Sequence, residues 1–380
     1  MTALVLPGIG RYRTVGAALP AADPTPSTSR IAFAAAHVVA DPYADSTPAR
    51  PALDWDATLR FRHHLWSLGL CVADAMDTAQ RGMGLDWPNS RELITRSGAE
   101  AASVGGRLAC GAGTDQLTGP AGDLEEVTAA YEEQIAVVEE AGAQVILMAS
   151  PALAALAKGP EDYHAVYGRL LAQVRRPVIL HWLGPMFAPA LTGYWGSPDL
   201  DTATETLLEI LKAWQPKVDG IKLSLLDADR ERALRARLPA GVRMYTGDDF
   251  NYPELIAEDG GAHSDALLGI FDPIAPIAAA ALRALDTGDT DRYTGLFAPT
   301  VALSRLLFAE PTYYYKTGVV FLAWLTGHQE HFLMVGGQQS ARSVPHLAKV
   351  FVLADKAGLF PDPDLAAARM RQLLVVAGMD

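Results

Sequence analysis

The feature of this sequence that most constrains its fold is a set of eight apolar segments separated by longer, helix-like stretches. Within each segment apolar residues are almost continuous and do not alternate with polar ones. Such segments are typical of parallel β-strands that are covered on both faces. The segments are Ile31–Val39, Leu70–Ala75, Arg107–Gly111, Val145–Ala149, Val178–Leu183, Gly220–Leu223, Val242–Thr246 and Ala266–Phe271.

The stretches between these segments have the spacing of helices. From Leu124 to Ala141 apolar residues recur on one helical face, with Asp123 suited to begin the helix and Gly142 to end it. Eight strands alternating with helices over about 250 residues predict an α/β fold, a (β/α)8 TIM barrel. A doubly wound sheet is the weaker alternative, because Gln116 stands where the glycine-rich dinucleotide motif needs its third glycine.

We expect three regions along the chain. Residues 1–29 form an N-terminal segment with a possible hairpin, residues 30–286 form the barrel, and residues 287–380 form a C-terminal helical region. Glycine and proline residues punctuate the last part and set off its helices. The expected helices after the last strand are Ile274–Leu285, Asp291–Leu307, Tyr313–Leu325, Val344–Ala357 and Pro363–Val376.

The composition excludes several classes of protein. The 380 residues carry a formal net charge of -13, which argues against nucleic acid as a partner. The apolar run Thr317–Leu325 is too short to cross a membrane. Met1–Gly8 lacks the basic residues of a secretory signal, and the two cysteines, Cys71 and Cys110, indicate buried thiols. We therefore expect a cytoplasmic protein that binds neither nucleic acid nor membrane.

The ends of the expected strands carry the candidate functional side chains, because barrel enzymes build their sites there. As candidate catalytic residues we name Lys222, His181 and Asp74. The candidate substrate-binding residues are His37, Asp77, Thr114, Trp182, Ser224, Asp248, Asp249 and Phe271.

Lys222 lies near the end of the strand-like stretch Val218–Ser224 and is the most specific of these candidates. A buried ammonium is costly, so a lysine at this place is paired, solvated or chemically used. A desolvated lysine loses its proton more readily, and the neutral amine attacks carbonyl groups. Lys222 is therefore either an imine-forming nucleophile or a strand-end lysine paired with a carboxylate.

His181 ends another strand, and an imidazole transfers protons near neutral pH. His37, Asp74, His181 and Asp248 together offer an alternative, a divalent-metal site with nitrogen and oxygen ligands. His328 and His331 follow Gly327 in the helical tail, and we expect them at the surface or in an interface.

Several short motifs, in the same order along the chain, resemble the dihydrodipicolinate synthase and N-acetylneuraminate lyase superfamily. Gly220-Ile221-Lys222 resembles the segment that carries this family's Schiff-base lysine, and Gly247-Asp248-Asp249 resembles its Gly-Asp-Asp turn. Pro177–His181 lies where the family has a strand ending in a catalytic tyrosine, and Gly111–Gly113 lies where it often has Gly-Thr-Gly. The resemblance covers roughly residues 30–360 and identifies the chain as a divergent, uncharacterised branch.

The resemblance implies a barrel with a C-terminal helical extension, an imine-forming Lys222, no cofactor and a homo-oligomer, dimer or tetramer. Two departures bear on the substrate. The family's Gly-Thr-Thr-Gly-Glu segment, which holds a keto-acid carboxylate, is replaced by Ala73–Asp77, and its tyrosine by His181. Carboxylates accept hydrogen bonds from hydroxyl groups, so this site suits a keto-sugar or a sugar-derived keto acid.

Three functions follow from these observations. The first is a class I lyase, aldolase or hydratase-type enzyme of carbohydrate metabolism, which acts on a small carbonyl compound through an imine at Lys222. The second is a metal-dependent lyase or isomerase on the same barrel. The third is a non-catalytic binding barrel, which the loss of the threonine pair allows and the many polar groups at the strand ends disfavour.

Overall fold

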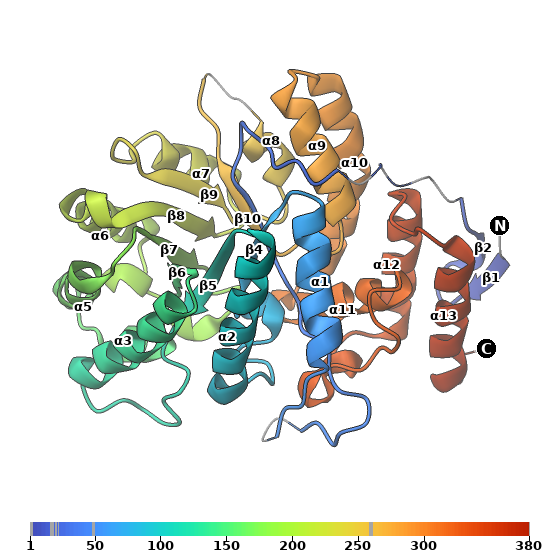
Figure 1. Ribbon diagram of the computed structural model, residues 1–380, viewed down its shortest axis with the longest axis horizontal. Coiled ribbons are helices and arrows are strands. Elements are labelled where there is room, and N and C mark those ends of the chain that lie inside the picture. The colour runs from blue at the N-terminus through green and yellow to red at the C-terminus, as the bar shows by residue number, and fades with distance from the viewer. Residues whose placement is uncertain are drawn as a thin grey trace. The chain divides into compact units, whose positions relative to one another are not determined.

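The computed structural model describes residues 3–15, 19, 21, 23–47, 50–257 and 261–379. Eight strands form a closed barrel in the order β10-β3-β4-β5-β6-β7-β8-β9 (Figure 1). The strands are β3 (Ala32–Ala35), β4 (Cys71–Asp74), β5 (Leu108–Ala112), β6 (Gln144–Leu147), β7 (Val178–Leu183), β8 (Val218–Ser224), β9 (Arg243–Thr246) and β10 (Asp265–Leu268). Each overlaps a predicted segment, so the predicted TIM barrel with C-terminal helices is confirmed.

The chain divides into two compact units, which we describe separately. The first comprises residues 1–70, 77–85 and 269–380. The second comprises residues 71–76 and 86–268. This division crosses the three regions expected from the sequence, because β3 and the helices after β10 belong to the same unit.

The second unit contains β4 to β10 and the helices that lie between these strands in the sequence. The registers of β4 to β10 are parallel throughout. Its helices are α2 (Trp87–Val104), α3 (Leu124–Glu140), α4 (Pro151–Leu156), α5 (Pro160–Gln173), α6 (Leu200–Ala213), α7 (Ala228–Arg235) and α8 (Tyr252–Ile256).

Local capping explains why α3 begins and ends where the sequence predicts. The Asp123 carboxylate accepts a hydrogen bond from the Glu126 N–H, which satisfies a donor that the helix leaves unpaired. Gly142 follows the last residues of the helix with a φ of 76°, a conformation that glycine adopts without steric cost.

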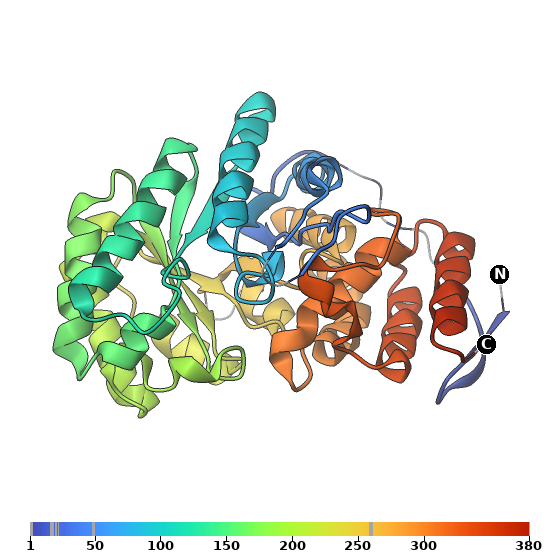
Figure 2. The ribbon, with the colours of Figure 1, turned by 90° about the horizontal axis from the view of Figure 1, so that it is seen from below.

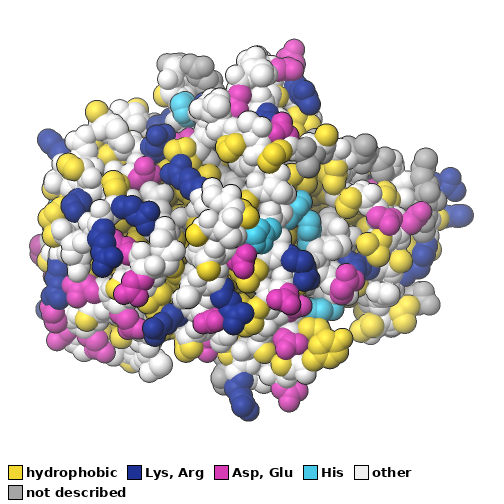
Figure 3. Space-filling view, in the orientation of Figure 1, with side chains coloured by type: hydrophobic (Ala, Val, Ile, Leu, Met, Phe, Trp, Pro, Cys, Tyr) yellow, Lys and Arg dark blue, Asp and Glu magenta, His cyan; other side chains and the backbone are white. Residues whose placement is uncertain are grey.

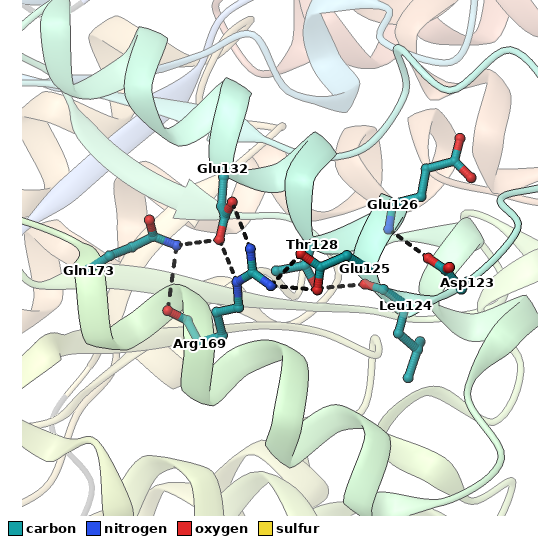
Figure 4. A network of polar contacts seen from close by, with 8 residues as sticks. All are labelled: Asp123, Leu124, Glu125, Glu126, Thr128, Glu132, Arg169 and Gln173. Carbon is teal, nitrogen blue, oxygen red and sulfur yellow. Dashed lines mark hydrogen bonds and ion pairs between the residues drawn. The ribbon is translucent and has the colours of Figure 1, made fainter.

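The outer surface of this unit carries both signs of charge close together (Figure 3). Figure 4 shows one such network, in which Arg169 of α5 bonds to Glu125 and Glu132 of α3. Arg169 and Glu125 are well exposed, so solvent screens this network and it adds little to stability.

The first unit contains β3, an N-terminal hairpin and the remaining helices. The hairpin joins β1 (Ala3–Leu6) to β2 (Gly10–Arg13) in an antiparallel pair, as the sequence suggested. The helices are α1 (Trp55–Ser67), α9 (Ala275–Asp286), α10 (Thr290–Leu307), α11 (Tyr315–Leu325), α12 (Val344–Lys356) and α13 (Pro363–Val376).

The hairpin is fastened to the C-terminal helices. The Tyr12 hydroxyl and the Val15 N–H both donate to the Asp355 carboxylate in α12, at 2.6 and 2.7 Å. Arg371 of α13 donates to the Ala3 carbonyl, and β1 lies beside α13 in both ribbon views (Figures 1 and 2). These bonds order a segment that would otherwise fray.

Two further expectations from the sequence concern membrane-spanning helices and the state of the cysteines. In the part of the chain that the structure describes, no helix is long and apolar enough to cross a membrane. Cys71 and Cys110 are free thiols, and Cys110 is buried while Cys71 is half-buried.

The contact between α2 and α3 yields a matched pair of stability tests. A Cβ at Gly98 in α2 would lie 2.3 Å from the Ala141 carbonyl oxygen, so Gly98→Ala should lower the free energy of unfolding by about 1–3 kcal/mol. Gly295 lies exposed in α10 with open space around it. Gly295→Ala should therefore raise that free energy by about 0.5–1 kcal/mol.

Urea titration of both variants measures the two effects. Equal effects of the two substitutions would show that helix propensity, and not the close approach at Gly98, decides the outcome.

Candidate functional site

In the second unit, Lys222 lies near the end of β8, beside the end of β7. The register pairs His181 with Lys222 and Leu183 with Ser224. Alternate residues of a strand point to the same face, so Lys222 and Ser224 share one face of β8. Lys222 is 8% exposed, and His181 Nε2 lies 3.2 Å from Ser224 Oγ. The structure thus brings together the predicted lysine, histidine and serine.

The turn after β9 closes over this group. A Cβ at Gly247 would lie 2.2 Å from Ser224 Oγ and 2.9 Å from Lys222 Cε. The Gly247 N–H donates to the Leu223 carbonyl at 2.9 Å, which fixes the turn to β8. A residue without a side chain is required here because the backbone itself packs against Lys222.

The environment of His181 keeps its imidazole neutral. Burial and then the nearby Lys222 charge lower the pKa of His181 well below its ordinary value. Its Nδ1 is buried and has no hydrogen-bond partner among the residues that the structure describes. The imidazole is therefore uncharged at neutral pH.

Asp74 and Thr114, also predicted from strand ends of this unit, form local hydrogen bonds. Ser97 donates to Asp74 Oδ2 at 2.6 Å, and the Ala75 N–H donates to Asp74 Oδ1 at 2.8 Å. Thr114 Oγ1 lies 2.6 Å from Ser150 Oγ. Asp74 is therefore held by its neighbours, and Thr114 and Ser150 form a hydroxyl pair.

The three further candidates of this unit, Trp182, Asp248 and Asp249, are buried. Asp248 accepts hydrogen bonds from Phe250 N–H and from Asn251, so it shapes the chain after β9. Burial raises the pKa of Asp248, and the hydrogen bonds from Asn251 and Phe250 oppose this rise. Trp182 packs edge-on against Trp195 at 6.3 Å between ring centroids.

In the first unit, His37 follows β3 and binds Asp272. Asp272 Oδ2 lies 2.7 Å from His37 Nδ1 and accepts the His37 backbone N–H at 2.8 Å. A carboxylate at Nδ1 fixes the tautomer and leaves Nε2 as an acceptor in the neutral ring. His37 Nε2 is buried and has no hydrogen-bond partner in the described ranges.

Two further histidines lie beside this pair, and the sequence analysis did not predict that they would come together there. The rings of His64 and His328 lie 4.3 Å apart, and Phe61 contacts both of them and His37. Burial, followed by the His64 and His37 charges, lowers the pKa of His328 to about 3. The sequence analysis expected His328 at the surface or in an interface, and the structure shows it half-buried against His64 and Phe61. No spacing in the sequence signals a contact between residues so far apart.

The other first-unit candidates lie in different surroundings. Phe271 is fully buried and stacks on Phe297 at 6.0 Å between centroids. Asp77 begins a 3-10 helix, η1 (Asp77–Ala79), and is half-buried. Its charge favours protonated Lys316, a lysine that is 1% exposed and whose pKa burial lowers to about 8. Lys316 is a second buried lysine, which the sequence reasoning did not single out.

The described residues do not form the divalent-metal site that the sequence analysis gave as an alternative. Among the residues that the structure describes, no three or more His, Cys, Asp and Glu side chains could hold a metal ion together. In the second unit, Asp74, His181 and Asp248 are each hydrogen-bonded to other side chains.

The fold defines the class of protein to which the chain is similar, that of dihydrodipicolinate synthases. The enzyme from Thermotoga maritima aligns with a TM-score of 0.61 at 14% identity, covering 93% of this chain and 100% of that chain. The enzyme from Bacteroides thetaiotaomicron gives 0.63, 14%, 85% and 98%. A chloride-inhibited enzyme from Acinetobacter baumannii, complexed with pyruvate, gives 0.62, 18%, 88% and 100%. At these identities the likeness shows the fold.

The chain itself belongs to a family of proteins of unknown function, DUF993, whose model matches residues 8–379. No curated protein matches the chain. The resemblance seen in the sequence is thus confirmed as a likeness of fold to the synthases.

The buried histidines predict how stability depends on pH. The pKa of His328 is about 3 in the folded protein, against an ordinary 6.5, so the unfolded state binds more protons between these values. The free energy of unfolding should therefore fall as the pH drops below about 6.5. His328→Gln should reduce this dependence by up to about 1.4 kcal/mol per pH unit.

Urea titrations at several pH values measure the slope. His164 lies on the surface beside Glu209, and His164→Gln should leave the slope unchanged. An unchanged slope in His328→Gln would contradict the neutral state assigned to this histidine.

Proposed function

We propose that this chain is a lyase of the class I aldolase type, which forms a Schiff base between Lys222 and a carbonyl substrate. The observation that carries the proposal is the position of Lys222. It lies at the carboxyl end of β8, it is 8% exposed, and the Gly247 backbone packs against its side chain. The carboxyl ends of the strands are where barrels of this class hold their catalytic groups.

The proposed reaction depends on the amine of Lys222. Neutral Lys222 adds to the carbonyl carbon, and water leaves. In aldol cleavage the resulting iminium accepts the electron pair of the breaking C–C bond. In dehydration it accepts the pair of the α C–H bond as a base takes the proton, and the enamine then expels the β-hydroxyl group, which leaves as water. Hydrolysis then returns the lysine and releases the product. Aldol cleavage and dehydration both proceed from the same intermediate.

His181 is the better supported of the two residues predicted to transfer the proton. Its imidazole is uncharged at neutral pH, it pairs with Lys222 in the register of β7 and β8, and its Nε2 lies beside Ser224. Both oxygens of Asp74 accept hydrogen bonds, from Ser97 and from Ala75, which suits a structural role.

For the substrate we propose a small keto-sugar or a sugar-derived keto acid. Thr114, Ser150, Ser224 and Asp248 give this unit hydroxyl and carboxyl groups that match a polyhydroxylated carbonyl compound. The Acinetobacter baumannii enzyme, which shares the fold, was crystallised as a complex with pyruvate, a keto acid. The roles given to Asp249, Trp182, His37, Asp77 and Phe271, and the homo-oligomer, stay predictions.

Borohydride trapping tests the imine. The protein is incubated with pyruvate, dihydroxyacetone or fructose, reduced, digested and examined by mass spectrometry. We expect a reduced adduct on Lys222 with one of these probes and none in Lys222→Arg, because a guanidinium does not form the imine.

Two other lysines control the assignment. Lys217, five residues earlier, donates to the Val174 carbonyl, and Lys217→Arg should keep the adduct. Lys316 is buried and has a lowered pKa, so it is the competing amine. An adduct mapped to Lys316, or an adduct that survives in Lys222→Arg, would overturn the assignment.

The Gly247 contact gives a second test. In Gly247→Ala the new methyl group would overlap Ser224 Oγ and crowd Lys222 Cε. We expect the rate of adduct formation to fall by at least about tenfold, since a misplacement of about 1 Å can cost a hundredfold.

Gly119 has open space around it, and Gly119→Ala serves as the matched control with an unchanged rate. A Gly247→Ala protein that folds and traps the probe at the full rate would show that the turn does not set the position of Lys222.

A further inference from the structure

Glu231 is a buried carboxyl group that the proposed chemistry does not use. It lies in α7, is 1% exposed, and connects three elements of the second unit. Thr246, the last residue of β9, donates to Glu231 Oε2 at 3.0 Å. Ser264, directly before β10, donates to Glu231 Oε1 at 2.7 Å. The carboxyl group thus holds the ends of two neighbouring strands.

Glu231 is linked through Thr246 to the turn that packs on Lys222. Thr246 Oγ1 accepts the Asp248 N–H at 3.2 Å, so one hydroxyl group joins Glu231 to the turn. Within the same turn, Gly247 contacts Ser224 and Lys222. Two hydrogen bonds and one packing contact therefore connect Glu231 with the side chain of Lys222.

Burial opposes the ionisation of Glu231. Burial is the main reason that the pKa of Glu231 rises to about 8, and the negative charge of Asp248 raises it further. The hydrogen bonds from Ser264 and Thr246 and the charge of Arg235 act in the other direction. Arg235 itself donates to Ser264 Oγ and to the Leu255 carbonyl.

The turn would therefore meet a new charge if Glu231 lost its proton. Asp248 already lies in the field of Glu254 in α8, which raises the pKa of Asp248. An ionised Glu231 would repel the Asp248 carboxylate. It would also bind the Thr246 hydroxyl group more strongly and draw it away from the turn.

We propose that Glu231 is a positioning residue, which holds the turn Gly247–Asp249 against Lys222 only while its carboxyl group carries a proton. The inference rests on the proposed function, because it concerns the regulation of the Lys222 site. Its consequence is an upper pH limit for that site, imposed by a residue that does not touch the substrate.

The pH profile of borohydride trapping tests this inference. For the wild-type protein we expect the yield on Lys222 to fall above a pH of about 8, although deprotonation of an amine alone would make it rise. Glu231→Gln keeps a neutral group of the same shape, and the hydroxyl hydrogens of Thr246 and Ser264 can turn to match it. This variant should hold its yield and exceed the wild type several-fold near pH 9.

Glu205→Gln is the matched control, since Glu205 of α6 is an exposed glutamate paired with Arg237, and it should follow the wild-type profile. If Glu231→Gln does not fold, Thr246→Val decides, because it cuts the link to the turn. This variant should trap poorly at every pH and show no fall near pH 8.

The outcomes separate the two proposals. No adduct on wild-type Lys222 at any pH overturns the proposed function. An adduct whose pH profile is the same in wild type and Glu231→Gln, or a Thr246→Val profile that matches the wild type, overturns the positioning role and leaves the lysine chemistry intact.

Discussion

The placement of an amine at the end of β8 is the constraint on which the rest of the second unit depends. An 8% exposed lysine needs neighbours that tolerate both its charged and its neutral form. The structure supplies an imidazole, a hydroxyl group and the close backbone of Gly247. Because a side chain at position 247 would meet Ser224, the glycine of this turn and the serine of β8 restrict one another. The path of the chain after β9 is in this way fixed by what lies on β8.

Most buried ionisable groups of the two units are kept neutral or are hydrogen-bonded. In the second unit, burial lowers the pKa of His181 and raises that of Glu231, so each group favours its uncharged form. In the first unit, His37 is bound to Asp272. A charge removed from water without a partner costs several kcal/mol, and a fold escapes that cost by neutralising or pairing the group. The stability of the fold then depends on pH.

The sequence predicts the barrel well because parallel strands covered on both faces leave a strong pattern. All eight strands and the five helices after β10 overlap the predicted segments. The neighbourhood of Lys222 and His181 could be predicted because both lie near the ends of apolar runs, and the carboxyl ends of barrel strands meet at one end of the barrel. The site is predictable to the extent that it depends on strand ends.

What the sequence does not reveal depends on long-range contacts. Asp272 stands at an expected strand end, but its bond to His37 joins residues 235 positions apart. Glu231 lies in a short helix of mostly charged residues, a pattern typical of a solvated surface helix, yet it is 1% exposed. The fold overrides the local pattern there, because the helix places one face against the ends of β9 and β10.

Lys316 shows why a lowered pKa does not by itself identify a nucleophile. Lys316 lies in α11, whose residues are all buried, and its ammonium sits 4.1 Å from the centre of the Tyr313 ring and donates to the Tyr313 carbonyl. Its surroundings are aromatic rings that stabilise a cation and offer a substrate few polar partners. Lys222 instead lies beside an imidazole and a hydroxyl group that can exchange protons with a bound carbonyl compound. The difference between the two lysines is one of neighbours, and it is the reason why we propose the imine chemistry at Lys222 of β8.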